Sequence, residues 1–291
     1  MRKCMMSNYF YSYLKLARLD KPVGILLLLW PTLWALILSS EGQIRFQELL
    51  IFCIGVILTR SAGCVINDIF DHDIDAKVRR TSSRPLAQNL LTLKNASIFF
   101  LFLSLGALSL LLFLHSYAIK IICLSAFLLM FYPLSKRFFH IPQLFLALAF
   151  SSSILVVYAH VQQSLTLESW ILFFMNFSWV MAYDTVYAKA DFADDINLSI
   201  HSSPKLFKKY TNHAIVVFYL AFLTLYAILF REDPYFIAYF LIVTFMIGKM
   251  VHELIFGITK DDDYINLFKK NNYLGIIVTF MFLLSHTWIF L

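Results

Sequence analysis

Apolar residues occur along this chain in long stretches, and most charged residues lie between them. A helix needs about 17 to 25 mostly apolar residues to cross the hydrocarbon core of a bilayer. Nine stretches approach or meet that length, so we predict nine transmembrane helices. They are Val23–Ser39, Leu49–Asn67, Ala96–Leu114, Ala118–Phe131, Ile141–His160, Trp170–Ala188, His213–Phe230, Tyr235–Val251 and Tyr273–Phe290.

The composition supports this pattern. Of 291 residues, 60% are hydrophobic and only 14% are charged. Soluble domains are roughly one-quarter charged, which excludes a soluble globule with one core. We predict an all-α, polytopic integral membrane protein that forms a single domain over residues 1–291.

Basic residues predict how the helices are oriented. If the N-terminus is cytoplasmic, twenty Lys and Arg residues lie on the cytoplasmic side, and only Arg45, Lys120 and Arg231 lie outside. Because basic loops stay in the cytoplasm, we expect a cytoplasmic N-terminus and, in a bacterium, insertion into the inner membrane. We expect the basic residues that give the net charge of +6 to contact anionic membrane lipid, and we expect no nucleic-acid partner.

The cysteines suggest no further chemistry. Cys4, Cys53, Cys64 and Cys123 lie in or near apolar stretches, without the spacing of metal ligands. We therefore expect neither a disulfide framework nor a zinc site.

Eight of the 18 acidic residues fall in two short segments, Asn67–Asp75 (NDIFDHDID) and Asp184–Asp195 (DTVYAKADFADD). Both segments lie at predicted cytoplasmic helix ends. If the second helix continues past Asn67, its helical repeat places several polar residues on one face. That face holds Arg60, Asn67 and Asp71, flanked by Asp68 and Asp75, and the corresponding stripe of the second segment holds Asp184, Asp191 and Asp195.

Carboxylates crowded on one face repel each other unless cations lie between them. The two segments contain aspartate without glutamate, cysteine or paired histidines, which favours Mg²⁺ over zinc or copper. Mg²⁺ takes its remaining ligands from water and substrate phosphate, so a diphosphate would fit between the segments. We expect Asp73, Asp194 and the run Asp261–Asp263 to be solvated surface instead.

Arg60 lies within the second predicted helix. An arginine at membrane depth is costly unless it is paired or hydrated, or its side chain reaches the interface. Its shared face with Asn67 and Asp71 favours a functional role.

At these residues the chain resembles the UbiA family of membrane-bound aromatic prenyltransferases. The first acidic segment resembles the family motif N-D-x-x-D-x-x-x-D, and the second resembles Y-A-x-x-D-x-x-D-D. The resemblance covers nearly the whole length. Further similar blocks are DKPVGILLLLWPTLWAL (Asp20–Leu36), RSAGCVIND (Arg60–Asp68), RRTSSRPL (Arg79–Leu86), YPLSKR (Tyr132–Arg137), MAYDTVYA (Met181–Ala188) and NNYLG (Asn271–Gly275).

The resemblance implies nine helices around a central cavity that opens to the cytoplasm and to lipid. It implies Mg²⁺ as cofactor, with polyprenyl diphosphate and 4-hydroxybenzoate as substrates. Asp71, Asp75, Asp191 and Asp195 would hold metal and diphosphate, supported by Asn67, Asp68 and Asp184. Arg80, Arg84 and Lys136 would neutralise the diphosphate, Arg60 with Asn67 would receive the hydroxybenzoate, and Arg137 would contact one of the two substrates.

The implied reaction transfers the polyprenyl group to the ring of 4-hydroxybenzoate, ortho to the hydroxyl, and releases diphosphate in ubiquinone biosynthesis. A related enzyme with homogentisate, a naphthoate or a tetrapyrrole as acceptor is an alternative. A cation transporter is another, although transporters place ion ligands near the bilayer midplane.

Three residues depart from the family pattern after or within the second motif. Ser199 stands where a glycine is usual, His201 where a lysine is usual, and Ala193 where close relatives have an acid. Since histidine is mostly neutral at pH 7, we expect modestly altered activity.

Overall fold

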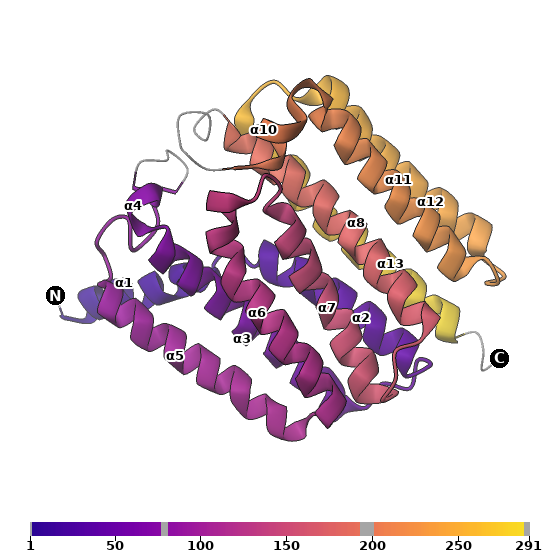
Figure 1. Cartoon of the computed structure of the whole chain (residues 1–291), viewed down its shortest axis with the longest axis horizontal. Helices are drawn as coiled ribbons and strands as arrows, with labels where there is room; N and C mark the ends of the chain where they lie inside the picture. Colours follow the sequence, from indigo (N-terminus) through magenta and orange to yellow (C-terminus); the bar gives the residue numbers. More distant parts are fainter. Residues whose placement is uncertain (1, 77–80, 193–200, 288–291) are drawn as a thin grey trace. The chain divides into compact units, whose positions relative to one another are not determined.

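The computed structural model describes the backbone of residues 2–76, 81–192 and 201–287, with side chains for 9–76, 81–128, 138–192 and 201–285. Within these residues every regular element is a helix (Figure 1), which confirms the all-α prediction. A helix corresponds to each of the nine predicted segments. These helices are α2 (Val23–Ser39), α3 (Phe46–Phe70), α5 (Leu93–Ser109), α6 (Ser116–Phe138), α7 (Gln143–Val161), α8 (Leu167–Ala190), α11 (Thr211–Phe230), α12 (Phe236–His252) and α13 (Asp261–Thr287).

Several short elements were not predicted. They are α1 (Arg2–Leu16), α4 (His72–Asp75), α10 (Ser203–Phe207), the 3₁₀ turns η1 (Leu110–Phe113) and η2 (Lys208–Tyr210), and the π-helical turn η3 (Glu253–Gly257).

Three predicted boundaries were wrong by more than a turn. Helix α5 ends at Ser109, before the predicted end at Leu114, and the 3₁₀ turn η1 follows it. Helix α6 continues to Phe138, well beyond the predicted end at Phe131. Helix α13 starts at Asp261 instead of Tyr273, so the acidic run is the first turn of a helix. There the Asp263 carboxylate accepts backbone N–H groups of Thr259 and Lys260, at 2.9 Å each, and these bonds lower the pKa of Asp263. Acidic side chains at a helix N-terminus are favourable because they oppose its dipole.

In the described part of the chain, five helical segments are long and apolar enough to cross a membrane: Phe46–Phe70, Leu93–Phe113, Gln143–Val161, Ser203–Phe230 and Phe236–Gly257. Their outward faces carry large apolar side chains. In the segment of α5 and η1, Phe102 is 69% exposed and Leu112 is 85% exposed. Such faces need lipid around them, as expected for an integral membrane protein.

The chain divides into two compact units. The first comprises Met1–Leu29 and Phe46–Leu114, and the second comprises Trp30–Arg45 and His115–Leu291. The single domain over residues 1–291 stays a prediction.

In the first unit, α3 packs against α5 and α1. Its core includes Leu16, Val65, Leu86 and Leu103. Helix α1 ends at Leu16, and Arg18, two residues later, has a positive φ of 59°. The N–H of the following residue, Leu19, donates to the carbonyl of Leu14 at 2.9 Å. This reversal directs the chain away from α1 after a single residue in the left-handed conformation.

In the second unit, α8 packs against α7, α11 and α13, and α6 packs on α7. Figure 1 shows α6, α7 and α8 side by side. Helix α8 carries the second acidic motif at its C-terminal end. The position of this motif therefore depends on how α7, α11 and α13 pack against α8.

A buried asparagine joins three of these helices. The Asn271 Oδ1 atom accepts the indole N–H of Trp179 at 2.8 Å and the hydroxyl of Tyr219 at 3.0 Å. The block containing Asn271 also meets α2, where the Trp30 indole N–H donates to Asn272 at 3.2 Å. Two sequence blocks that carry the family resemblance thus contact each other inside this unit.

We predict that Asn271→Leu lowers the melting temperature, because the buried Trp179 and Tyr219 donors lose their acceptor. An unsatisfied buried donor costs about 1–3 kcal/mol. Thermal unfolding in detergent measures the effect. Tyr219→Phe should cost less in the Asn271→Leu background than alone, and equal costs in the two backgrounds would contradict the role of Asn271 as shared acceptor.

Candidate functional site

The first acidic motif spans the end of α3 and the short helix α4. Helix α3 ends at Phe70, and Asp71 has ψ near 8°, so the predicted continuous helix is interrupted there. The backbone hydrogen bonds nevertheless continue. The Asp71 N–H donates to the carbonyl of Asn67 at 2.9 Å, and the Asp75 N–H donates to the carbonyl of Asp71 at 2.8 Å. Asn67, Asp71 and Asp75 therefore still follow one another at one-turn intervals.

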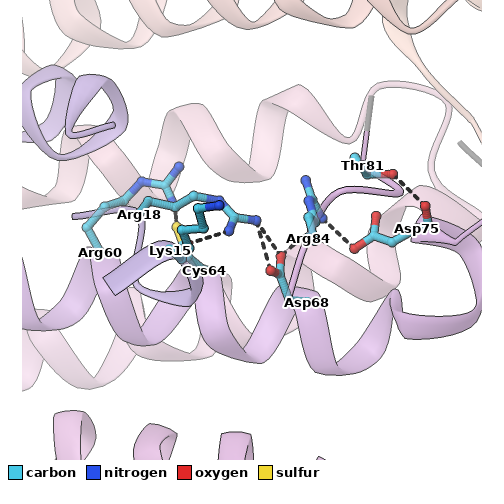
Figure 2. Close-up of polar contacts among 8 residues, drawn as sticks. All are labelled: Lys15, Arg18, Arg60, Cys64, Asp68, Asp75, Thr81 and Arg84. Atoms are coloured by element: carbon cyan, nitrogen blue, oxygen red, sulfur yellow. Dashed lines mark hydrogen bonds and ion pairs between the residues drawn. The ribbon is translucent and has the colours of Figure 1, made fainter. Parts of the chain in front are cut away.

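Asp68 is the most buried carboxylate of this motif, with only 1% of the residue exposed. Arg18 Nη2 donates to both of its oxygens, at 2.7 and 2.9 Å, and Arg84 Nη1 donates to Oδ1 at 3.0 Å (Figure 2). Burying a carboxylate is costly unless it is paired. The two arginines provide that pairing, and Asp68 ties their segments to the end of α3.

Arg84 is shared with a second acid. Its Nη1 atom also donates to Asp75 Oδ2 at 2.6 Å. The Asp75 carbonyl accepts the Thr81 hydroxyl at 3.0 Å, which holds the segment before Arg84 against α4. Burial raises the pKa of Asp75, Arg84 opposes the rise, and the charges of Asp68 and Asp71 add to it. The pKa of Asp75 is therefore raised mainly by burial, which Arg84 offsets only in part.

Sequence reasoning missed Arg18 as a site residue and counted it only as a loop cation. It contacts Asp68 although the two are 50 residues apart in sequence. Arg18 Nη1 also donates to the carbonyl of Lys15 at 2.8 Å, which fixes its guanidinium at the end of α1. The only signal in the sequence was its place just before the block Asp20–Leu36.

Arg60 lies two turns before Asn67 on α3 and is half-buried. Its Nη1 atom donates to Cys64 Sγ at 3.0 Å. Its guanidinium lies against the first turn of α2, because a Cβ added to Gly24 would be 2.9 Å from Nη2. Among the described residues, the buried Oδ1 atom of Asn67 has no hydrogen-bond partner and can accept one from a ligand.

The second acidic motif begins in α8. Asp184 is half-buried, and Asp191 follows two turns later at the C-terminal end of the helix. Between them, Lys189 Nζ donates to Asn212 Oδ1 at 2.6 Å and lies 4.7 Å from the centroid of the Tyr264 ring. These contacts connect the end of α8 to α11 and α13.

Ser203, the first residue of α10, contacts two other helices of the second unit. Its hydroxyl donates to Thr185 Oγ1 at 3.1 Å, and its N–H donates to Gln143 Oε1 at 3.2 Å. Nearby, the ring of His201 lies 4.5 Å, centroid to centroid, from that of His140. His201, at the position where the family usually has lysine, therefore packs against another imidazole.

Several predicted site residues lie outside the described part of the chain. For Asp195 and Arg80 neither backbone nor side chain is described, and for Lys136 and Arg137 only the backbone, in α6, is described. Ala193 and Ser199 are also outside it. The roles predicted for these residues stay predictions.

The side-chain oxygens described in the first acidic motif suit a hard cation. No group of three or more His, Cys, Asp and Glu side chains in the described residues could hold a metal ion alone. Asp71 and Asp75 would supply carboxylate oxygens. This small oxygen-only set matches Mg²⁺, which commonly uses one or two carboxylates and completes its shell with water and phosphate.

Comparison with known proteins identifies the family. The UbiA prenyltransferase family matches residues 28–272. The chain belongs to the UbiA prenyltransferase family. Among curated relatives of this UbiA-family protein, 4-hydroxybenzoate octaprenyltransferase of Pasteurella multocida is 41% identical over 275 residues, covering 94% of each chain. The Vibrio cholerae protein of the same name is 38% identical, covering 94% of this chain and 97% of the relative.

Solved structures agree on the UbiA fold. A UbiA homolog from Aeropyrum pernix matches with a TM-score of 0.75 at 21% identity, over 87% of this chain and 94% of that one. A homolog from Archaeoglobus fulgidus, bound to GPP and Mg²⁺, matches with a TM-score of 0.72 at 18% identity, over 96% of this chain and 99% of that one. Membership in a prenyltransferase family decides against the cation transporter.

We predict that Arg18→Gln lowers the free energy of unfolding of this UbiA-family protein by about 3 kcal/mol, because it leaves a buried carboxylate short of a partner. Thermal unfolding of the purified protein measures the change. Arg231→Gln is the control, since Arg231 and its partner Glu232 are exposed and such pairs contribute little. Adding Asp68→Asn to Arg18→Gln should restore most of the stability, and a further loss would contradict the pairing.

The raised pKa of Asp75 predicts a pH dependence in metal chelator. The folded protein holds this proton more tightly than the unfolded chain. Its stabilising contribution is therefore complete below the unfolded pKa and is lost as the pH rises through the folded pKa. We therefore expect the melting temperature to fall as the pH rises through the folded pKa. Asp75→Asn should weaken this fall, whereas Asp73→Asn, at a side chain that is 93% exposed, should not. An unchanged pH profile in Asp75→Asn would refute the assignment.

Proposed function

We propose that this protein is a 4-hydroxybenzoate polyprenyltransferase of the bacterial inner membrane. It transfers a polyprenyl group from polyprenyl diphosphate to the ring of 4-hydroxybenzoate, ortho to the hydroxyl, in ubiquinone biosynthesis. The curated relatives bear the name of this activity and match nearly the full length. The excess of basic residues on one side supports a cytoplasmic active site.

The observation that carries the choice of acceptor is the position of Arg60 relative to Asn67. Their separation of seven positions corresponds to about 10 Å along α3, at 1.5 Å per residue. 4-Hydroxybenzoate has its carboxylate and hydroxyl at opposite ends of a rigid ring. With its carboxylate on the Arg60 guanidinium, its hydroxyl points along α3 toward the unpaired Asn67 Oδ1, which can accept the O–H.

The acidic motifs hold the other substrate. In this proposal Asp71, Asp75, Asp191 and Asp195 bind Mg²⁺ and, through it, the diphosphate. When bound, Mg²⁺ neutralises charge on the diphosphate and makes it a better leaving group. Asp68 keeps Arg84 beside Asp75, so a cation stands next to the carboxylates. Arg80, Lys136 and Arg137 supply further positive charge from cytoplasmic segments.

The protein's own residues then position the reaction. Basic side chains stabilise the negative charge that grows on the diphosphate as the allylic C–O bond breaks. Arg60 fixes the acceptor ring, so that the carbon ortho to the hydroxyl faces the allylic carbon. The electron-rich ring forms the new C–C bond there, and the ring carbon loses its proton to restore aromaticity.

We predict Mg²⁺-dependent formation of prenylated product from labelled 4-hydroxybenzoate and polyprenyl diphosphate in membranes containing the protein. Asp71→Asn and Asp191→Asn should each lower kcat/KM roughly 100-fold or more, because each removes charge that stabilises the transition state. Asp73→Asn is the matched control, since its carboxylate is exposed. Full activity in chelator, or in both motif variants, would overturn the proposal.

A further inference from the structure

Cys64 and Gly24 both limit where the Arg60 guanidinium can lie. Cys64 lies one turn further along α3, and its Sγ atom accepts from Nη1 at 3.0 Å (Figure 2). Gly24 lies in the first turn of α2. A Cβ at position 24 would lie 2.9 Å from Nη2, 3.2 Å from Nε and 3.4 Å from Cζ. The guanidinium thus occupies the space that any larger side chain at this position would take.

The electrostatics of this contact favour an anion. The first turn of a helix has N–H groups without intrahelical partners and carries the positive end of the helix dipole. In α2 that turn is directly beside the guanidinium, since Gly24 lies within the turn. Two positive groups side by side repel each other, and a carboxylate that accepts hydrogen bonds from the guanidinium relieves the repulsion.

We infer that Gly24 and Cys64 are positioning residues for the acceptor: they hold the Arg60 guanidinium where it receives the carboxylate of the aromatic substrate. This rests on the proposed function. Gly24 acts by leaving room along α2, and Cys64 acts by directing Nη1. Neither residue needs to touch the diphosphate, so both should act on the acceptor alone.

Gly24→Ala separates this role from folding. The atoms that a new methyl group would meet belong to the far end of a flexible side chain, so the guanidinium can move aside at little cost in stability. Moving it misplaces the hydrogen bonds to the substrate. Gly63→Ala is the matched control, because an added Cβ at this glycine of α3 meets nothing within 4 Å.

The experiment measures kcat and KM for 4-hydroxybenzoate and for polyprenyl diphosphate separately, in membranes containing each variant. We expect Gly24→Ala to raise the KM for 4-hydroxybenzoate roughly ten-fold, the size of one misplaced hydrogen bond to a charged group. The KM for polyprenyl diphosphate should stay unchanged. Cys64→Ala should act in the same direction, and Cys64→Ser, which keeps an acceptor, should act less.

A neutral acceptor of the same shape gives a second measurement. 4-Hydroxybenzamide has no charge for the guanidinium to recognise. The ratio of kcat/KM for the acid to that for the amide should therefore fall in Gly24→Ala and Cys64→Ala and stay constant in Gly63→Ala. In an Arg60→Gln background, Gly24→Ala should have no further effect on this ratio, since the two substitutions affect the same group.

The outcomes distinguish this inference from the proposed function. If the wild-type protein forms no product from 4-hydroxybenzoate, the proposed function fails. If it is active but Gly24→Ala and Cys64→Ala both match Gly63→Ala, the positioning role is wrong. A rise in the KM for polyprenyl diphosphate instead would assign the guanidinium to the diphosphate and overturn the inference. Cys64→Ala tests the same point if Gly24→Ala does not accumulate in membranes.

Discussion

The first unit depends on one buried carboxylate. Asp68 is almost fully shielded from solvent, and a charge in that position is stable only with close cationic partners. Its partners come from two other segments, the end of α1 and the loop after α4. One acid thereby fixes three parts of the chain around the end of α3. The arrangement of Asp71, Asp75 and Arg84 follows from that anchor.

This arrangement divides the acids of one motif between two tasks. Asp68 is occupied by arginines and serves as a structural anchor, although it lies only three residues before Asp71. Asp75 has Arg84 as a partner, and its pKa is still raised. Burial that Arg84 offsets only in part would be offset further by another cation beside Asp75. The same nine-residue segment thus holds one acid used for stability and others that are available to the proposed metal.

Much of the fold could be predicted from the sequence, because a helix that crosses a lipid bilayer needs a long apolar run. Long apolar runs predicted all nine helices, although the polar start of α13 hid its first turns. The spacing of Asn67, Asp71 and Asp75 predicted their succession at one-turn intervals. Arg18 could not be found in this way, since its contact with Asp68 joins residues that are distant in sequence. The short α4 and the loss of regular helix at Asp71 were not predicted either.

The left-handed conformation of Arg18 has a consequence for engineering. Glycine is the usual residue at such a helix end, because it adopts a positive φ without a steric penalty. This chain has arginine there instead and accepts local backbone strain at φ 59° in exchange for a cation beside Asp68. Replacing Arg18 with glycine, as a consensus design would, relaxes the backbone and removes the positive charge beside Asp68. Position 18 is therefore one where routine thermostabilisation would work against the ion pair that anchors the first acidic motif.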